Sequence, residues 1–377
     1  MAADPLAAGR SLTDLLDRGE RELGESLAQL ASGSGSATAP HRATDPYRAA
    51  ASRLGDALAR RPHGGAGLDP LVWLVYYRLG QAILHQPPRS CPWATTLDRP
   101  DPLDQPDRLD QLAGRCLPAG QVIAWGDSSF YTAAEWEAIL ALLQEGGDFV
   151  TDLAPPSAAA QSALEEATAA VLALVRRLPA GLGPSIDRLL RLTILAVPGP
   201  QAQAARQGFG GATAFFLRGA SVIHASPGLT LPGLLERLVH EAAHAELFVL
   251  AQDGPLCHNP DDERHPVRIR PDPRPMNGIL HSLHVTGRVC ETLDALLADG
   301  FLASGFSGPR EPALLLEDCQ RLREQQAELG RSSLAAARRH GRLTELGQAV
   351  CEAGARRLAG TGAKGAGAKG ARAEGAP

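Results

Sequence analysis

Apolar residues recur every three or four positions through most of the chain, which is the spacing of amphipathic helices. Proline-rich stretches interrupt this pattern, most densely between residues 86 and 106. A threonine at position 132 is followed three residues later by Glu135, as a helix capping box requires. In the first half of the chain we therefore predict helices over residues 45–60, 70–84, 132–144 and 162–177.

The pattern changes near residue 190, where short apolar runs predict strands. Residues 191–197 (RLTILAV) form such a run and are followed by Pro-Gly-Pro. After a glycine-rich turn at 208–211, two further apolar runs flank Arg218 and Gly219, which indicates a hairpin or two edge strands. We expect a small antiparallel sheet here, and an edge at 214–225 that could pair with an extended peptide.

Helical periodicity returns in the last part of the chain. We predict helices over 231–250, 278–299, 311–329 and 332–358. The fold class is therefore α+β and mainly α, with a small antiparallel sheet packed beside a metal-binding helix pair. Three regions are expected: a mainly helical N-terminal region (1–200), a metal-binding catalytic region (201–358), and a disordered low-complexity tail (359–377).

The basic residues of this 377-residue chain are almost all arginine. Of its 37 basic residues, only Lys364 and Lys369 are lysines, and both lie in the tail. The rest of the chain therefore lacks the lysine of a Walker phosphate loop and the amine of Schiff-base or pyridoxal phosphate chemistry. Any cation that binds a ligand there must be arginine, whose planar fork suits carboxylates.

Charge and cysteine content indicate the partners and the compartment. The formal net charge of −5 does not favour nucleic acid as a partner. No uncharged apolar run of about 18 residues predicts a membrane span, and the acidic N-terminus does not resemble a signal peptide. The 6 cysteines are scattered and form no CxxC pair. We expect a cytoplasmic protein with no nucleic-acid or membrane partner.

The helix predicted over 231–250 contains the motif with the most specific chemistry. His240-Glu241-Ala242-Ala243-His244 is an HExxH sequence in an otherwise apolar segment. Residues four apart on a helix share one face, so the two imidazoles can bind one divalent metal ion, with Glu241 beside it. Two histidines and a glutamate are costly in an apolar segment unless they have partners, which favours a metal site.

The next predicted helix offers candidates for a third ligand. His281, His284, Arg288 and Glu291 are spaced so that they share one face. In a zinc peptidase, Glu291 would be the third ligand and Glu241 the general base. In an iron oxygenase, His281 would be the third ligand, and an arginine would hold the far carboxylate of 2-oxoglutarate. The candidate arginines are Arg268, Arg270, Arg274 and Arg288.

The two segments LVHEAAHAELFVL and MNGILHSLHVTGRVCETL, with an RPDPRP loop between them, resemble a known family. It is the HExxH-motif family of iron- and 2-oxoglutarate-dependent β-hydroxylases that modify ribosomally synthesised (RiPP) precursor peptides. The resemblance covers about residues 212–297. It implies a dioxygenase that uses Fe(II), with 2-oxoglutarate and O2 as cosubstrates, to hydroxylate the β-carbon of a residue in a precursor peptide.

The resemblance also implies roles for individual residues. His240, His244 and His281 would bind iron, with His284 left as an alternative to His281. Arg274 or Arg288 would hold 2-oxoglutarate, and Arg270 in the same loop is a further candidate. Glu241 would orient a ligand or a bound water. The alternative function, a zinc-dependent metallopeptidase, remains open at this point.

Overall fold

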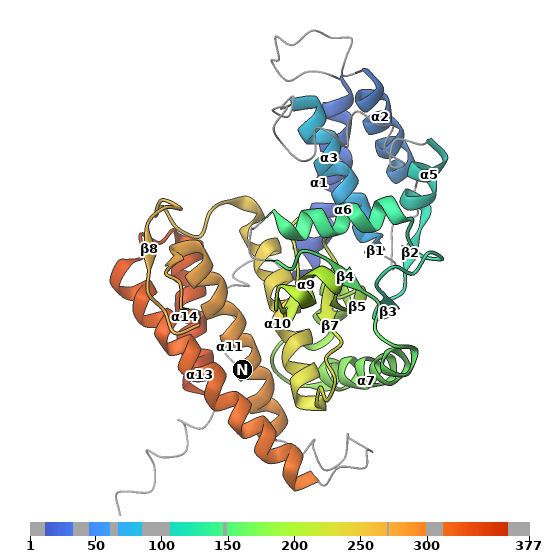
Figure 1. The fold of residues 1–377 in the computed structure, drawn as a ribbon. Coiled ribbons are helices and arrows are strands. Elements are labelled where there is room, and N and C mark those ends of the chain that lie inside the picture. The colour runs from blue at the N-terminus through green and yellow to red at the C-terminus, as the bar shows by residue number, and fades with distance from the viewer. Residues whose placement is uncertain are drawn as a thin grey trace, which may run out of the picture. The chain divides into compact units, whose positions relative to one another are not determined.

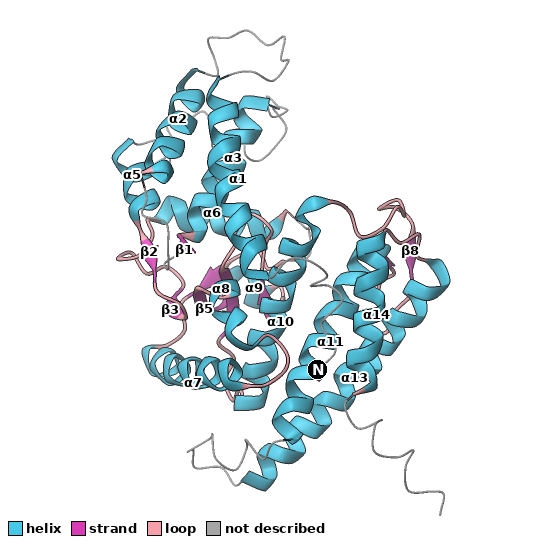
Figure 2. Cartoon of the chain, turned by 180° about the vertical axis from the view of Figure 1, so that it is seen from behind, coloured by secondary structure: helices cyan, strands magenta, loops and turns pink. Residues whose placement is uncertain are grey.

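The computed structural model confirms a mainly α, α+β fold with a small mixed sheet (Figures 1 and 2). Most of the proline-rich stretch predicted to be irregular, and the tail from residue 361 onward, lie outside the described residues. The structure describes residues 12–32, 45–60, 67–84, 106–145, 149–269, 271–298 and 312–360.

Two compact units make up the chain. One consists of Ser11–Ala169 and Asp187–Leu229, and the other contains Ala170–Ile186 and Thr230–Pro377. The division differs from the one we expected near residue 200, because the strands that follow this point pair with the strand that precedes it and so belong to the N-terminal unit.

In the N-terminal unit, the helices over 45–59, 70–84 and 133–144 form where the apolar periodicity predicts them, whereas those over 12–32 and 106–114 were not predicted. Their shared core includes Leu27, Leu54, Leu71 and Leu109, all almost fully buried. The predicted capping box at Thr132 is present, because its side chain accepts from Glu135 N and Glu135 bonds back to the Thr132 backbone. These helices are α1 (Leu12–Ser32), α2 (Asp45–Ala59), α3 (Pro70–Leu84), α5 (Pro106–Gly114) and α6 (Ala133–Gln144).

The main sheet of this unit is mixed, so the predicted antiparallel sheet was wrong. Its order is β3-β5-β7-β6, with β3 (Gln121–Ala124), β5 (Leu192–Pro198) and β7 (Ala220–His224) all parallel. The residues between β5 and β7, which include α9 (Pro200–Ala204), are numerous enough to return the chain to the same end of the sheet. The antiparallel partners are β4 (Leu153–Ala154), β6 (Gly211–Ala212), and, in a separate pair, β1 (Gly67–Leu68) and β2 (Cys116–Leu117).

The edge predicted over 214–225 is also wrong. β7 pairs with β5 along its whole length and with β6 at Val222 and Ile223, so it is an inner strand. Its residues from Ala220 to Ile223 are buried, so they do not form an exposed edge. The hairpin alternative holds in part, because β6 and β7 are antiparallel neighbours in the chain.

One described helix is long and apolar enough, by length and composition, to cross a membrane. It is α7 (Ala158–Arg177), and it leads through η3 (Gly183–Ser185) and α8 (Ile186–Leu189) to β5. Val171, Leu172 and Val175 of this helix are buried inside the protein. One such helix is weak evidence for a membrane span, because helices in protein cores have the same length and composition.

The C-terminal unit is a set of helices that surrounds a second apolar core. This core includes Leu247, Ile279, Leu283, Val350 and Leu358. A two-stranded antiparallel sheet precedes α11, and its second strand leads directly into that helix. The elements are α10 (Leu231–Leu250), η4 (Ala251–Asp253), β8 (Arg264–His265), β9 (Arg274–Pro275), α11 (Met276–Ala298), α13 (Pro312–His340) and α14 (Glu345–Ala359).

The helix break predicted between residues 329 and 332 does not occur, and α13 continues to His340. Gly330 lies inside this helix, where an added Cβ would be 2.5 Å from Leu358 Cδ2 and 2.7 Å from Thr286 Oγ1. This glycine therefore permits close packing of three helices rather than ending one. The chain turns after His340, and Thr344 caps α14 by accepting a hydrogen bond from Gly347 N.

Candidate metal centre

The HExxH motif lies in the middle of α10. Thr230 caps the helix by accepting from Gly233 N, and Pro232 stands in its first turn. His240 and His244 are one turn apart on one face, and their ring centroids are 5.0 Å apart. Both side chains are partly exposed, whereas the Glu241 residue is only 4% exposed. The helix therefore presents two imidazoles together and buries the glutamate between them in the sequence.

His281 of α11 joins this pair. Its Nδ1 is 3.5 Å from the Nδ1 of His244, and the two ring centroids are 5.7 Å apart. Two nitrogens bound to one zinc-like ion at about 2.1 Å each are separated by roughly 3.4 Å in a tetrahedral site. The observed distance fits two donors to one ion, and it also fits a hydrogen bond between one protonated and one bare nitrogen.

The partners of His240 determine which of its nitrogens could bind a metal. Its Nδ1 is 3.4 Å from Glu236 Oε1, which also accepts a hydrogen bond of 3.0 Å from Gln326 Nε2 of α13. A carboxylate that holds one imidazole N–H fixes the tautomer and leaves the other nitrogen with its lone pair. Glu236 therefore favours His240 Nε2 as the donor.

The electrostatic surroundings favour neutral imidazoles at His244 and His281. Burial, followed by the charges of His240, His281 and His284, holds the pKa of His244 well below its usual value. Burial and His284 lower the pKa of His281 to about 4. At His240, burial opposes protonation, but the Glu236 hydrogen bond and nearby carboxylates raise its pKa overall. A neutral imidazole is the form that binds metal ions.

The three imidazoles fit a metal by their chemistry, because imidazole suits iron, zinc, copper and nickel. His244 contacts both of the other rings. Within the described residues, however, no three His, Cys, Asp or Glu side chains already surround one point as a bound ion requires. The arrangement is therefore a donor set on two adjacent helices rather than a closed coordination shell.

The other candidates for the third ligand are held elsewhere. Glu291 Oε2 is 2.8 Å from Arg288 Nη1 and 3.1 Å from Arg357 Nε, so two guanidinium groups hold this carboxylate. Glu291 also lies ten residues after His281, about 15 Å along the helix. His284 is fully buried and places its Nε2 2.8 Å from Glu246 Oε2. His281 is thus the member of the predicted stripe whose ring lies against His244.

The candidate arginines have different surroundings. Arg288 donates to both oxygens of Glu246 at 2.6 and 2.7 Å, so the structure gives it an internal role instead of a free fork. Arg268 pairs with Glu328 on the surface. Arg274 is a half-buried residue of β9, immediately before α11. Arg270 lies outside the described residues.

An aromatic ring borders the imidazoles on one side. Phe248, one turn after His244, has its ring centroid 5.3 Å from that of His281 and 6.3 Å from that of His244. The carboxylate of Glu236 lies at the other end of the group, beside His240. The site is therefore polar at one end and apolar at the other.

Sequence reasoning missed the acidic partners of this site. Glu246 follows the motif by two residues and lies in an apolar run, where a charge needs a buried partner. That position could have been flagged, and arginine is the one cation available in a region without lysine. The role of Gln326, 90 residues from Glu236, has no counterpart in local sequence.

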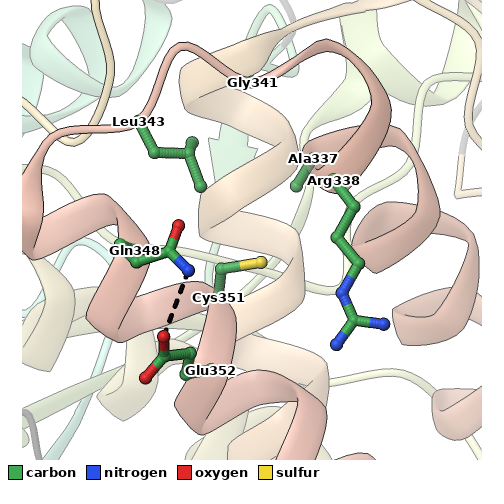
Figure 3. Close-up of a pocket in the computed structure, with 7 residues that line it drawn as sticks. All are labelled: Ala337, Arg338, Gly341, Leu343, Gln348, Cys351 and Glu352. Atoms are coloured by element: carbon green, nitrogen blue, oxygen red, sulfur yellow. Dashed lines mark hydrogen bonds between the residues drawn. The ribbon is translucent and has the colours of Figure 1, made fainter.

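A separate pocket of about 440 Å³ lies between α13 and α14 (Figure 3). Figure 3 shows the Cys351 thiol directed toward the space below Ala337 and beside Arg338, with Gln348 bonded to Glu352 at 3.1 Å. None of the predicted site residues lines it. The predicted metal ligands therefore lie on α10 and α11 and not at this pocket.

Comparison with models of known protein families gave no match, and comparison with curated proteins gave none either. Function therefore has to be inferred from the residues and geometry of α10 and α11. The strongest observation is the approach of a third imidazole, from another helix, to the two in the HExxH motif.

Proposed function

We propose that the protein is an Fe(II)- and 2-oxoglutarate-dependent dioxygenase that hydroxylates the β-carbon of a residue in a ribosomally synthesised precursor peptide. The observation that carries this proposal is the 3.5 Å approach of His281 Nδ1 to His244 Nδ1. His281 is the third ligand that the resemblance to the peptide β-hydroxylases implies. The peptidase alternative needs Glu291 instead, and that carboxylate is held by Arg288 and Arg357.

In this proposal His240, His244 and His281 hold the iron. When bound, iron together with 2-oxoglutarate and dioxygen supplies the oxidising chemistry that inserts oxygen into an aliphatic C–H bond. Three protein ligands would leave coordination positions on iron open for the cosubstrates. Phe248 provides an apolar wall beside His281, which would exclude water from one side of the reacting carbon.

A cation must hold the far carboxylate of 2-oxoglutarate, and in this region it must be arginine. Arg274 is our candidate for this cation, because it immediately precedes α11, whereas Arg288 donates to both oxygens of Glu246. Its fork could bind a carboxylate through two parallel hydrogen bonds. Glu241, which is only 4% exposed, would orient a ligand or a bound water.

The proposed location is the cytoplasm. Cys257, Cys290, Cys319 and Cys351 are free thiols, which is typical of proteins in a reducing compartment. Burial raises the pKa of Cys290 and of Cys319 to about 11, so neither is a reactive thiolate near neutral pH.

The direct test is turnover of a precursor peptide encoded beside this gene. With Fe(II), 2-oxoglutarate and oxygen, we expect the peptide to gain the mass of one oxygen atom for each succinate released. The gain should disappear without 2-oxoglutarate. Three imidazoles are also a known donor set for catalytic zinc, so peptide cleavage by the zinc form, independent of 2-oxoglutarate, would contradict the proposal and favour the peptidase.

A further inference from the structure

Three charged or polar residues lie close to His244 and His281 in the sequence, on the same two helices. Glu246 follows His244 by two residues on α10, and His284 follows His281 by three residues on α11. Arg288 is one turn further along α11. The side chains of all three are at most 8% exposed. His244 and His281 thus each have, within one helical turn in the sequence, a buried polar residue that contacts the opposite helix.

The contacts among these three residues link α10 to α11 directly. Arg288 Nε donates to Glu246 Oε2 at 2.7 Å and Arg288 Nη2 donates to Oε1 at 2.6 Å, which is a bidentate pair. His284 Nε2 is 2.8 Å from Glu246 Oε2. The carboxylate therefore has contacts with two residues of α11 that are separated by one helical turn.

A second carboxylate extends the set to α14 and to the segment before α8. Arg288 Nη1 donates to Glu291 Oε2 at 2.8 Å and lies 3.5 Å from the Gly181 carbonyl oxygen. Arg357 of α14 lies 3.1 Å from the same Glu291 oxygen. The guanidinium of Arg288 is therefore fixed from several directions within one compact unit.

These contacts define how far one helix can slide along the other. Apolar side chains at a helix interface tolerate small shifts, because their attraction depends little on direction. A bidentate arginine–carboxylate pair has a fixed fork geometry and loses hydrogen bonds when the helices slip. Metal ligands must be held to about 0.5 Å of the productive geometry. A register that is set next to the ligands serves that need.

We propose that Glu246, Arg288 and His284 are positioning residues that set the register of α10 against α11 and so hold His244 next to His281. We call these three residues the brace. The inference rests on the proposed metal centre, but it concerns a juxtaposition that exists without metal. Buried ion pairs are often replaceable by apolar residues with little loss of stability, so the brace is assigned to ligand placement and not to folding.

The test compares two double variants of the full chain. E246Q/R288M removes the ion pair without leaving a buried charge and keeps an acceptor for His284. D294N/R323M is the matched control, because Arg323 Nε donates to Asp294 at 2.8 Å and links α11 to α13. With Co(II) as the probe, we expect the first variant to bind about tenfold more weakly or worse, with altered visible bands, and the control to bind like wild type.

A second measurement uses no metal. In the H244C/H281C variant, a short bifunctional thiol reagent should join the two introduced cysteines, and mass spectrometry of the linked peptides identifies the product. We expect the yield to fall when E246Q/R288M is added and to persist when D294N/R323M is added. If wild type binds no Co(II), that result overturns the proposed function but not the brace. The crosslink yield then tests the brace by itself.

Unchanged Co(II) affinity in a folded E246Q/R288M protein would overturn the brace. An equal loss in the control would overturn it too, because general loosening would then explain the effect. If the wild type binds no metal, an unchanged crosslink yield in E246Q/R288M would overturn it.

Discussion

Two polar groups lie within a few residues of each other on α10 and α11, and they differ in how their polar atoms are used. In the brace, Glu246 is shared by Arg288 and His284, and all three side chains are buried. In the imidazole group, His240, His244 and His281 are partly exposed, and two of their nitrogens face each other at 3.5 Å. In the brace a carboxylate is paired with a cation, whereas the imidazole group brings together three nitrogen donors of the same kind.

This difference separates structure from chemistry on one pair of helices. A carboxylate that already has three short contacts with cations and an imidazole has little left to offer a ligand. His244 and His281, whose pKa values are lowered, and His240 Nε2, which Glu236 favours as a donor, offer lone pairs that an added cation can use. The same motif helix therefore supplies both the site and its support, and the two groups should respond differently to mutation, metal and pH.

The largest expected effect on the free energy of unfolding comes from removing the carboxylate of the brace while its two partners remain. Glu246→Leu strands the buried Arg288 and His284 without their carboxylate, and we expect a loss of about 3–5 kcal/mol in the free energy of unfolding. In the imidazole group, His244→Ala in metal-free protein should stay within about 1 kcal/mol of wild type. Urea unfolding measures both, and similar losses in the two variants would contradict the distinction.

A bound metal ion should raise the free energy of unfolding of the protein only when the imidazole ligands are intact. At a free ion concentration 100 times the dissociation constant, binding raises the free energy of unfolding by about 2.7 kcal/mol. We expect this gain to vanish in His281→Ala and to persist in Glu291→Gln, as measured by unfolding with and without Fe(II) under anaerobic conditions. The reverse pattern would make Glu291 the ligand and support the zinc peptidase.

A smaller effect is expected at the polar end of the site. Glu236→Gln weakens the acceptor for His240 Nδ1 and should reduce metal affinity about tenfold, or about 1.4 kcal/mol, without removing a ligand. Glu324→Gln is a suitable comparison, because Glu324 is exposed on the same helix as Gln326. Isothermal titration with Zn(II) measures both. Equal affinities for Glu236→Gln and wild type would remove Glu236 from the site.

The two groups should also differ in pH dependence. His281 has a folded pKa of about 4 against an ordinary value of 6.5, so unfolded chains take up its proton first. The contribution of neutral His281 to the free energy of unfolding is present above pH 6.5 and is lost as the pH falls toward 4. Although burial opposes it, Arg288 and His284 hold the pKa of Glu246 far below 4.5, so the contribution of Glu246 is lost only below about pH 4.5.

In metal-free protein, His281→Ala should therefore flatten part of the stability profile between pH 6.5 and 4. His244 and His284, whose pKa values are also lowered, keep the remainder of the slope. Urea midpoints across this range measure the effect. A His281→Ala profile parallel to that of wild type would show that His281 is not held neutral.

Local sequence predicted most helices and one of the three parallel strands closely. The periodicity of α3 and α10 gave their bounds, and the run before Pro-Gly-Pro gave β5. The predicted antiparallel direction of the strands was wrong. Strand direction depends on how the chain between β5 and β7 returns across the sheet, and a short stretch of sequence does not determine this. The predicted helix break between residues 329 and 332 was wrong for a similar reason, since the space at Gly330 is limited by Leu358 and Thr286 of other helices.

The candidate site divides in the same way. HExxH spacing on a helix places His240 and His244 together, so that pair follows from local geometry. The choice of His281 over Glu291 depends on how α11 lies against α10 and on Arg357, which belongs to α14. The commitment of Arg288 to Glu246 likewise joins residues 42 positions apart, and no periodicity along one helix reveals it.

Anaerobic addition of Fe(II) and then 2-oxoglutarate tests the central claim most directly. Chelation of 2-oxoglutarate to protein-bound iron gives a weak charge-transfer band in visible light. We predict this band in wild type and in Glu291→Gln, and its loss in His281→Ala. Absence of the band in wild-type protein that has bound one equivalent of Fe(II) would contradict the assignment of this site as a 2-oxoglutarate-dependent iron centre.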